Sequence, residues 1–184
     1  MNKSVENLTI SQLDAAVEAK ISKAIDEAES KKSKRVLSLT LNSTGGSIEI
    51  AFSVLSKVHS SDYVDMHVRA SGSLGVVGTL FTAGAEFGHR IAEFGTTFRI
   101  LEDNPIEDGV DLKSKKQQDK LILDTLKILT GKKKLLDETV KTSSIVNFQT
   151  AKKLGFIDNE PKFKSKYRVK KAKQNVITDS ENKQ

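Results

Sequence analysis

A serine in a glycine-rich turn is the first feature of this sequence that could carry chemistry. The stretch 70-ASGSLGVVGTLFTAGA-85 places Ser73 between a strand-like apolar run and a helix-like apolar run. The pentad 71-SGSLG-75 approaches the GxSxG nucleophile elbow, in which glycines allow a sharp turn that exposes the serine. A serine stands in the first glycine position of that motif, so the turn by itself indicates only a candidate nucleophile.

A second glycine-rich turn, 43-STGGS-47, lies between another strand-like run and another amphipathic run. Backbone N–H groups at strand-to-helix turns of a parallel sheet point out together, so two such turns on one sheet edge could bind an oxyanion. Neither turn carries the lysine of a phosphate-binding loop, and the dinucleotide fingerprint GxGxxG is absent. The pair therefore favours acyl chemistry over nucleotide binding.

The elements that must position these turns follow from hydrophobic periodicity. Apolar residues at helical spacing predict an N-terminal helix over about 9–30, capped by Thr9 or Ser11, and a long helix over about 112–131 ended by Gly131. Further helices are expected at 47–58, 76–85 and 148–155, with a helical turn inside 132–144. Strands are expected at 36–42, 62–70, 88–94, 96–101 and 156–158. This alternation predicts one α/β domain over 1–160, with helices covering a largely parallel sheet.

Composition limits the chemistry further. The chain has 184 residues and no cysteine, which excludes a thiolate nucleophile, a thiolate zinc site and disulfides. No metal or cofactor motif is present, and we expect neither. The N-terminus lacks an apolar h-region, and no run of roughly 18 apolar residues occurs, so we expect a cytoplasmic protein without membrane contact.

The net charge of +6 is concentrated near the C-terminus. The segment Lys162–Lys173 holds seven basic residues and no acid, which leaves about −1 for the remainder. Residues 161–184 are typical of a disordered basic extension. Nucleic-acid binding by Lys162–Lys173 is the less favoured alternative.

Four motifs in order resemble the Clp protease proteolytic subunit family, whose fold is shared with crotonase. They are 36-VLSLTLNSTGGSIEIAFSVLSKV-58, with Thr44 in place of the family's proline, 70-ASGSLGVVGTLFTAGAEFGHRIAE-93, 126-LKILTG-131 and 151-AKKLGFID-158. The resemblance implies repeated βαβ units, a projecting long helix, self-association into rings, peptide substrates and an ATP-dependent unfoldase partner. It also implies Ser73 as nucleophile and the Gly46 and Leu74 amides as the oxyanion hole.

The resemblance fails at the other two positions of the catalytic triad. Leu101 stands where the family has histidine, and Ser143 or Ser144 stands where it has aspartate. Counting back rigidly from Ala83-Gly84-Ala85 puts Gly75 at the serine position; we favour Ser73, with two extra residues in the following helix.

No replacement base is evident from the sequence. A serine nucleophile needs a general base within hydrogen-bond reach. His59 lies at the end of a helix, His67 lies six residues before Ser73, and His89 follows the buried helix. Glu102 and Asp103 adjoin the empty histidine position, and no lysine is marked as a buried base.

Three functions remain open at this stage. The first is a ring-forming, ClpP-like serine-peptidase-fold subunit, weakly active or a non-catalytic pseudoenzyme, that could join rings with an active ClpP-type paralogue. The second is a structural, scaffold or nucleic-acid-associated protein, for example of a phage, that reuses the fold. The third is an acyl-CoA-type enzyme of the wider superfamily, for which no carboxylate falls at a convincing acid/base position.

Overall fold

A four-stranded parallel sheet forms the larger part of the protein. The structure, a computed structural model, describes residues 4–102 and 112–158. The sheet has the order β1-β2-β3-β5, and every neighbouring pair is parallel. Its strands are β1 (Ser4–Leu13), β2 (Arg35–Gly46), β3 (Val64–Ser71) and β5 (Arg90–Ala92).

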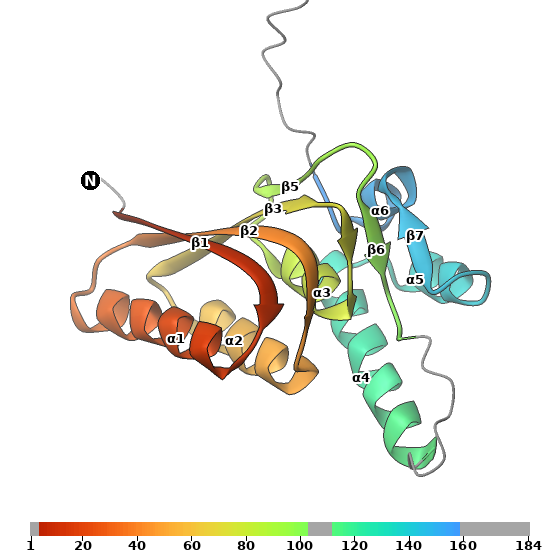
Figure 1. The fold of residues 1–184 in the computed structure, drawn as a ribbon, viewed down its shortest axis with the longest axis horizontal. Helices are drawn as coiled ribbons and strands as arrows, with labels where there is room; N and C mark the ends of the chain where they lie inside the picture. The colour runs from red at the N-terminus through yellow and green to blue at the C-terminus, as the bar shows by residue number, and fades with distance from the viewer. Residues whose placement is uncertain (1–3, 103–111, 159–184) are drawn as a thin grey trace, which may run out of the picture.

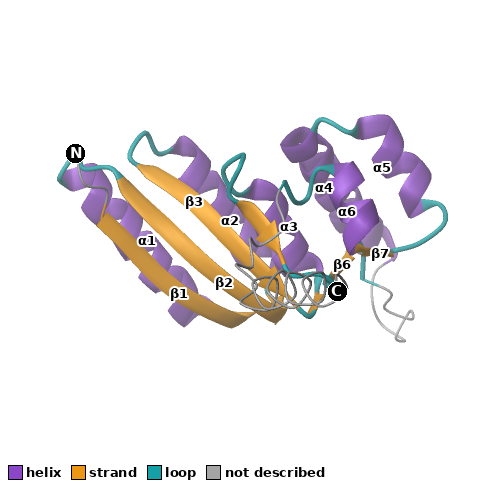
Figure 2. Cartoon of the chain, turned by 90° about the horizontal axis from the view of Figure 1, so that it is seen from above, coloured by secondary structure: helices purple, strands orange, loops and turns teal. Residues whose placement is uncertain are grey.

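Three helices cover one face of this sheet, as Figure 2 shows. They are α1 (Ala15–Ser30), α2 (Ile48–Ser60) and α3 (Val76–Gly84). The leucines of β2 point under the helices: Leu37, Leu39 and Leu41 are almost fully buried, while Thr40 on the opposite face is exposed. This alternation is that of a strand with one covered face, as the sequence predicted.

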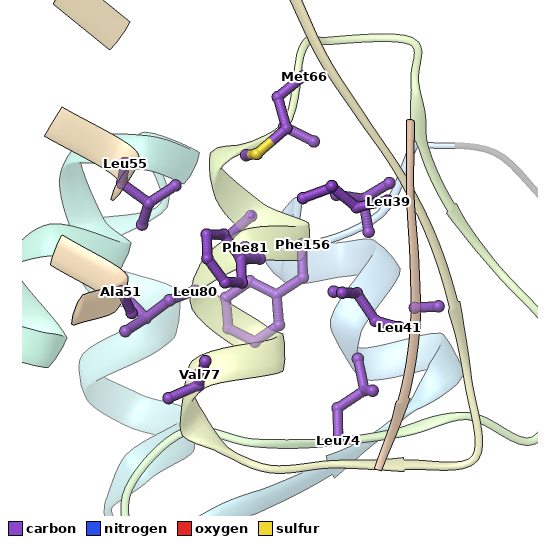
Figure 3. Close-up of a cluster of buried hydrophobic side chains, with 14 of the residues drawn as sticks. Leu39, Leu41, Ala51, Leu55, Met66, Leu74, Val77, Leu80, Phe81 and Phe156 are labelled. Carbon is purple, nitrogen blue, oxygen red and sulfur yellow. The ribbon is translucent and has the colours of Figure 1, made fainter. Parts of the chain in front are cut away.

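The helix α3 is the centre of the core. All nine of its residues are buried, which is the expected state of a helix that is apolar all round. It packs against β2, α2 and α4 (Leu112–Thr130), and its Leu80 and Phe81 meet Leu39, Leu55 and Phe156 in the cluster of Figure 3. The two buried threonines, Thr79 and Thr82, satisfy their hydroxyls by donating to the carbonyls of Gly75 and Gly78.

A second, smaller sheet carries the chain from the core to the C-terminal helices. It has the order β4-β6-β7, made of β4 (Ser73–Leu74), β6 (Thr97–Arg99) and β7 (Ile145–Asn147). Around it lie α4, α5 (Lys133–Val140) and α6 (Phe148–Leu154), and α4 projects away from the body (Figure 1). The predicted projecting helix and closing helix are therefore confirmed.

Two expected elements differ from the structure. The segment expected to start the first helix at about residue 9 is instead the strand β1, which pairs with β2 from Ser4↔Arg35 onward. The helix begins only after Asp14, whose carboxylate accepts the Val17 N–H at 2.9 Å, rather than after Thr9 or Ser11. Pairing with β2 gives the backbone of residues 4–13 its hydrogen bonds in the sheet instead of in an added helical turn.

The strand expected at 156–158 is absent as well. Phe156 and Ile157 are buried after the left-handed Gly155, and Asp158 donates one backbone hydrogen bond to the Arg90 carbonyl. Side-chain hydrogen bonds hold this segment, instead of the regular backbone hydrogen bonds of a strand. Asp158 accepts the Gly88 N–H at 2.7 Å, and Arg90 donates to the carbonyls of Ala85 and Gly155 at 2.8 and 2.9 Å.

No helix in the described ranges is long and apolar enough to cross a membrane. The basic segment 162–173 lies outside the described residues, as does Asp103.

Candidate active site

The two glycine-rich turns do meet at one edge of the sheet. β2 and β3 run in register up to the pair Asn42↔Ser71, where β3 ends, whereas β2 continues beside β1 to Gly46. Gly72 takes a left-handed conformation at φ +72°, and a Cβ at this position would lie 3.1 Å from the Asn42 side-chain oxygen. The short strand β4 then contacts β2. Parallel pairing thus brings residues 42–47 and 71–75 together.

Ser73 lies exposed on β4, opposite Thr97 of β6. Its hydroxyl accepts a hydrogen bond from the Thr97 hydroxyl at 3.1 Å. No histidine, lysine or carboxylate among the described residues hydrogen-bonds to Ser73. A threonine hydroxyl is no more basic than serine's own, so this contact orients the Ser73 hydroxyl without removing its proton.

Gly75 caps the start of α3, two residues after Ser73. The two placements of the family's serine thus differ in structural setting: Ser73 is in a strand, whereas Gly75 is at a helix N-terminus. Leu74 between them is buried, with its side chain 3% exposed, and pairs with Phe98.

Gly46 stands at the end of β2 in a conformation that only glycine adopts readily. Its φ is +130°, and a Cβ there would lie 2.3 Å from the Leu13 carbonyl oxygen. Ser47 follows, accepts the Ile50 N–H at 3.2 Å and caps α2. The resemblance implies a role for the Gly46 amide, and the close approach of β1 is a separate reason for a glycine at this position.

Leu101 and the pair Ser143 and Ser144, which the resemblance matches to the family's histidine and aspartate, lie in neighbouring segments of the chain. Leu101 lies two residues after the end of β6 and Ser144 lies immediately before β7, and the two strands are antiparallel, with Arg99 opposite Ile145. The Ile100 N–H donates to the Ser144 carbonyl at 2.7 Å. The side chain of Leu101 packs against the core, so this position holds an apolar contact in place of an imidazole.

Ser143, the other residue at the aspartate position, is used in its own turn. Its hydroxyl accepts the Ile145 N–H at 3.1 Å. A serine hydroxyl cannot supply the negative charge that stabilises an imidazolium. Leu101, Ser143 and Ser144 thus bring neither an imidazole nor a carboxylate to this end of the β6–β7 pair.

The three histidines lie elsewhere. His59 contacts the Gly84 carbonyl through Nε2 at 2.9 Å, at the far end of α3 from Ser73. His67 and His89 stack face to face, with ring centroids 3.6 Å apart and planes 2° apart. The backbone carbonyl of His89 accepts the Val68 N–H, which places the pair near the middle of β3, well before the serine turn.

One carboxylate that the sequence analysis did not consider lies close to Gly46. Glu49, in the first turn of α2, accepts a hydrogen bond from the Ser47 hydroxyl at 2.7 Å and another from Gln118 of α4 at 3.3 Å. The Ser47 hydrogen bond, aided by the Glu49 backbone amide and Gln118, lowers the pKa of this carboxyl below its usual 4.5.

Metal chemistry finds no support in the described residues, in which no group of three or more histidine, cysteine or acidic side chains is placed to hold an ion.

Comparison with solved structures decides the fold. The catalytic domain of the ClpP protease from Plasmodium falciparum matches the chain with a TM-score of 0.68 at 15% identity, over 86% of each chain. A peptidase from the same organism matches with a TM-score of 0.62 at 12% identity, over 85% of this chain and 94% of that one. The fold is ClpP-like. A further structure, described only as an enzyme, matches with a TM-score of 0.66 at 12% identity, over 84% of this chain and 94% of its own.

No protein-family profile and no curated protein matches the sequence. At 12–15% identity, the ClpP-like similarity concerns the course of the backbone and leaves the chemistry to the residues of this chain.

Proposed function

We propose that the chain is a non-catalytic or very weakly active ClpP-like subunit that acts through assembly. One observation carries the proposal: Leu101 and the Ser143–Ser144 pair, which the resemblance matches to the histidine and aspartate of a triad, lie in the neighbouring segments after β6 and before β7 and supply neither group. A triad that loses these members keeps only the oxyanion hole and binding, worth roughly 10³–10⁴ over the uncatalysed reaction. Ser73 remains the candidate nucleophile, with the Gly46 and Leu74 amides as its oxyanion hole.

Covalent labelling tests the catalytic part of the proposal. Folded protein is incubated with a fluorophosphonate and its intact mass is measured, with Ser73→Ala as the matched control and a known ClpP protease as the positive control. We expect no adduct on this chain. A single adduct that disappears in Ser73→Ala would show an activated serine and would refute the proposal.

A rebuilt site tests the assignment of positions. The double variant Leu101→His/Ser144→Asp supplies the missing groups, and a triple variant adds Gly75→Ser. Labelling of the double variant at Ser73 would support Ser73 as the nucleophile position. Labelling that appears only in the triple variant would assign that position to Gly75, where α3 begins.

Self-association is proposed from the ClpP-like fold and from the surface of α4. Leu121 and Ile128 are 53% and 77% exposed and lie two helical turns apart on one face of this projecting helix. Such apolar residues favour contact with a second copy, or with an active ClpP-type paralogue in a mixed ring. An ATP-dependent unfoldase partner and a cytoplasmic location belong to the same proposal.

Light scattering after gel filtration tests assembly. We expect a particle of several subunits, and we expect Leu121→Gln/Ile128→Gln to reduce its mass. The matched control is Val5→Gln/Phe87→Gln, which removes two exposed apolar side chains from other parts of the surface. A monomeric wild-type chain at all concentrations would refute the ring proposal and favour a scaffold role that reuses the fold.

A further inference from the structure

The charge of the described chain is divided between its two parts. Residues 4–102, which contain the parallel sheet and its helices, hold ten basic and twelve acidic residues, a net charge of −2. Residues 112–158, which form α4, α5, β7 and α6, hold eleven lysines, no arginine and five acidic residues, a net charge of +6. The near-neutral net charge expected outside the C-terminal tail is therefore not evenly distributed, because residues 112–158 are strongly basic.

The lysines of this part form an ordered arrangement on α4. Lys113, Lys116 and Lys120 recur three and four residues apart, a spacing that places them along one face of the helix. That face lies opposite the buried residues Ile122 and Leu126. We call these three residues the lysine stripe. Figure 1 shows that the N-terminal half of α4, which carries the stripe, projects beyond the body of the protein.

A second group follows at the other end of α4. Lys132, Lys133 and Lys134 are exposed at the start of α5. The length of α4 separates the two groups by roughly 20 Å, which corresponds to about six base pairs of a duplex. Lys127, between them, is neutralised by Asp137 at 2.8 Å.

Four charges, drawn from both groups, remain available. Lys116, Lys120, Lys133 and Lys134 are exposed and make no ion pair with any described residue. Unpaired lysines at helical spacing repel one another, so they are destabilising for the isolated chain. A polyanion that neutralises them would remove this repulsion and release its own counterions.

We propose that the lysine stripe and Lys132–Lys134 form a binding surface for the phosphate backbone of double-stranded nucleic acid, without sequence specificity. Lysine contacts phosphate as a point charge, whereas base recognition most often uses the bidentate geometry of arginine, which residues 112–158 lack. Single-strand binding needs exposed aromatic rings for base stacking. The two aromatic residues of this part, Phe148 and Phe156, are buried, which favours a duplex.

Fluorescence anisotropy with a labelled 24-base-pair duplex of mixed sequence tests the proposal on the full chain, between 50 and 300 mM KCl. The test variant is Lys116→Gln/Lys120→Gln/Lys133→Gln/Lys134→Gln. The matched control is Lys20→Gln/Lys23→Gln/Lys31→Gln/Lys32→Gln, which removes four exposed lysines of the sheet part and gives the same net charge. A third variant, Lys164→Gln/Lys166→Gln/Lys170→Gln/Lys171→Gln, neutralises the tail at constant chain length. Circular dichroism and thermal melting establish that every variant is folded.

We expect the wild-type chain to bind with a steep salt dependence. Losing four phosphate contacts should reduce the slope of log K against log [salt] by about 3–4, and the affinity at 50 mM KCl more than tenfold. The control variant should change this slope by less than about 0.9, the value of one phosphate contact. The proposal is overturned if the control weakens binding as much as the test variant, if the tail variant alone abolishes binding, or if a single strand or poly-glutamate binds better than the duplex. These outcomes are independent of labelling at Ser73, so the surface and the non-catalytic assignment can fail separately.

Discussion

Replacing Gly46 by alanine should destabilise the fold strongly, because this residue, a candidate for the oxyanion hole, packs its backbone directly against the edge strand β1. The backbone φ of +130° lies in a region that residues with a Cβ rarely adopt, which costs about 1–3 kcal/mol. The new methyl group would also lie 2.3 Å from the Leu13 carbonyl oxygen and 2.7 Å from the Leu13 nitrogen. These are backbone atoms of β1, so a side-chain rotation cannot relieve the overlap, and overpacking adds about 1–3 kcal/mol.

The expected loss for Gly46→Ala is therefore about 2–6 kcal/mol of unfolding free energy, a large part of the total stability of a typical domain. Urea denaturation followed by circular dichroism measures it. With a denaturant slope of about 2 kcal/mol per molar, the midpoint should fall by about 1–3 M urea.

The neighbouring glycine supplies the matched control. A Cβ at Gly45 meets nothing within 4 Å, and this residue has no positive φ. Gly45→Ala should leave the midpoint unchanged or raise it slightly, by up to about 1 kcal/mol. If Gly46→Ala unfolds within 0.5 M urea of the wild type, or Gly45→Ala costs as much, the close approach of β1 to the turn is wrong.

Two further predictions concern side chains that hold the turns and the closing segment. Asp158→Ala removes the acceptor of the Gly88 N–H. It also leaves the Arg90 guanidinium, whose side chain is 13% exposed, without the carboxylate that lies 3.9 Å away. The free energy of unfolding measured in urea should fall by about 2–4 kcal/mol, whereas the control Asp124→Ala, at an exposed position, should cost less than about 0.5 kcal/mol. For Glu49, the pKa is lowered in the folded state, so its stabilisation is present above the usual value of 4.5 and is lost as the pH falls through the depressed value. Glu49→Gln should thus be less stable than wild type at pH 7 by a few tenths of a kcal/mol and equal to it near pH 2, as measured by urea unfolding at each pH; a difference that persists at pH 2 would contradict the ionic origin of the effect.

Much of the fold could be predicted from the sequence because local patterns coincide with the tertiary structure. The alternation in 36-VLSLTLN-42 places leucines under the helices, and the uniformly apolar run 76-VVGTLFTAG-84 becomes the fully buried α3. The glycines at 45, 46, 72 and 75 identified both turns, since few other residues permit such bends.

The first strand could not be predicted in the same way. Residues 4–13 contain apolar and polar residues at spacings compatible with either structure, and the strand forms because β2 offers an unpaired edge. Likewise, the closing segment 156–158 contains strand-forming residues, yet Arg90 and Gly88 hold it by side-chain and isolated backbone hydrogen bonds.

The sequence alone determined which residue types this chain offers for catalysis: Ser73 in a glycine-rich turn, no cysteine, and leucine and serine at the positions that the resemblance matches to the partners of a triad. Only the tertiary structure decided which of these residues meet. The parallel register brings residues 42–47 and 71–75 to one edge and pairs Ser73 with Thr97. The β6–β7 ladder leads to the hydrogen bond from the Ile100 N–H to the Ser144 carbonyl, next to Leu101. The physical reason is that residue type is a local property, whereas proton transfer and charge pairing depend on distances of about 3 Å between segments far apart in the chain.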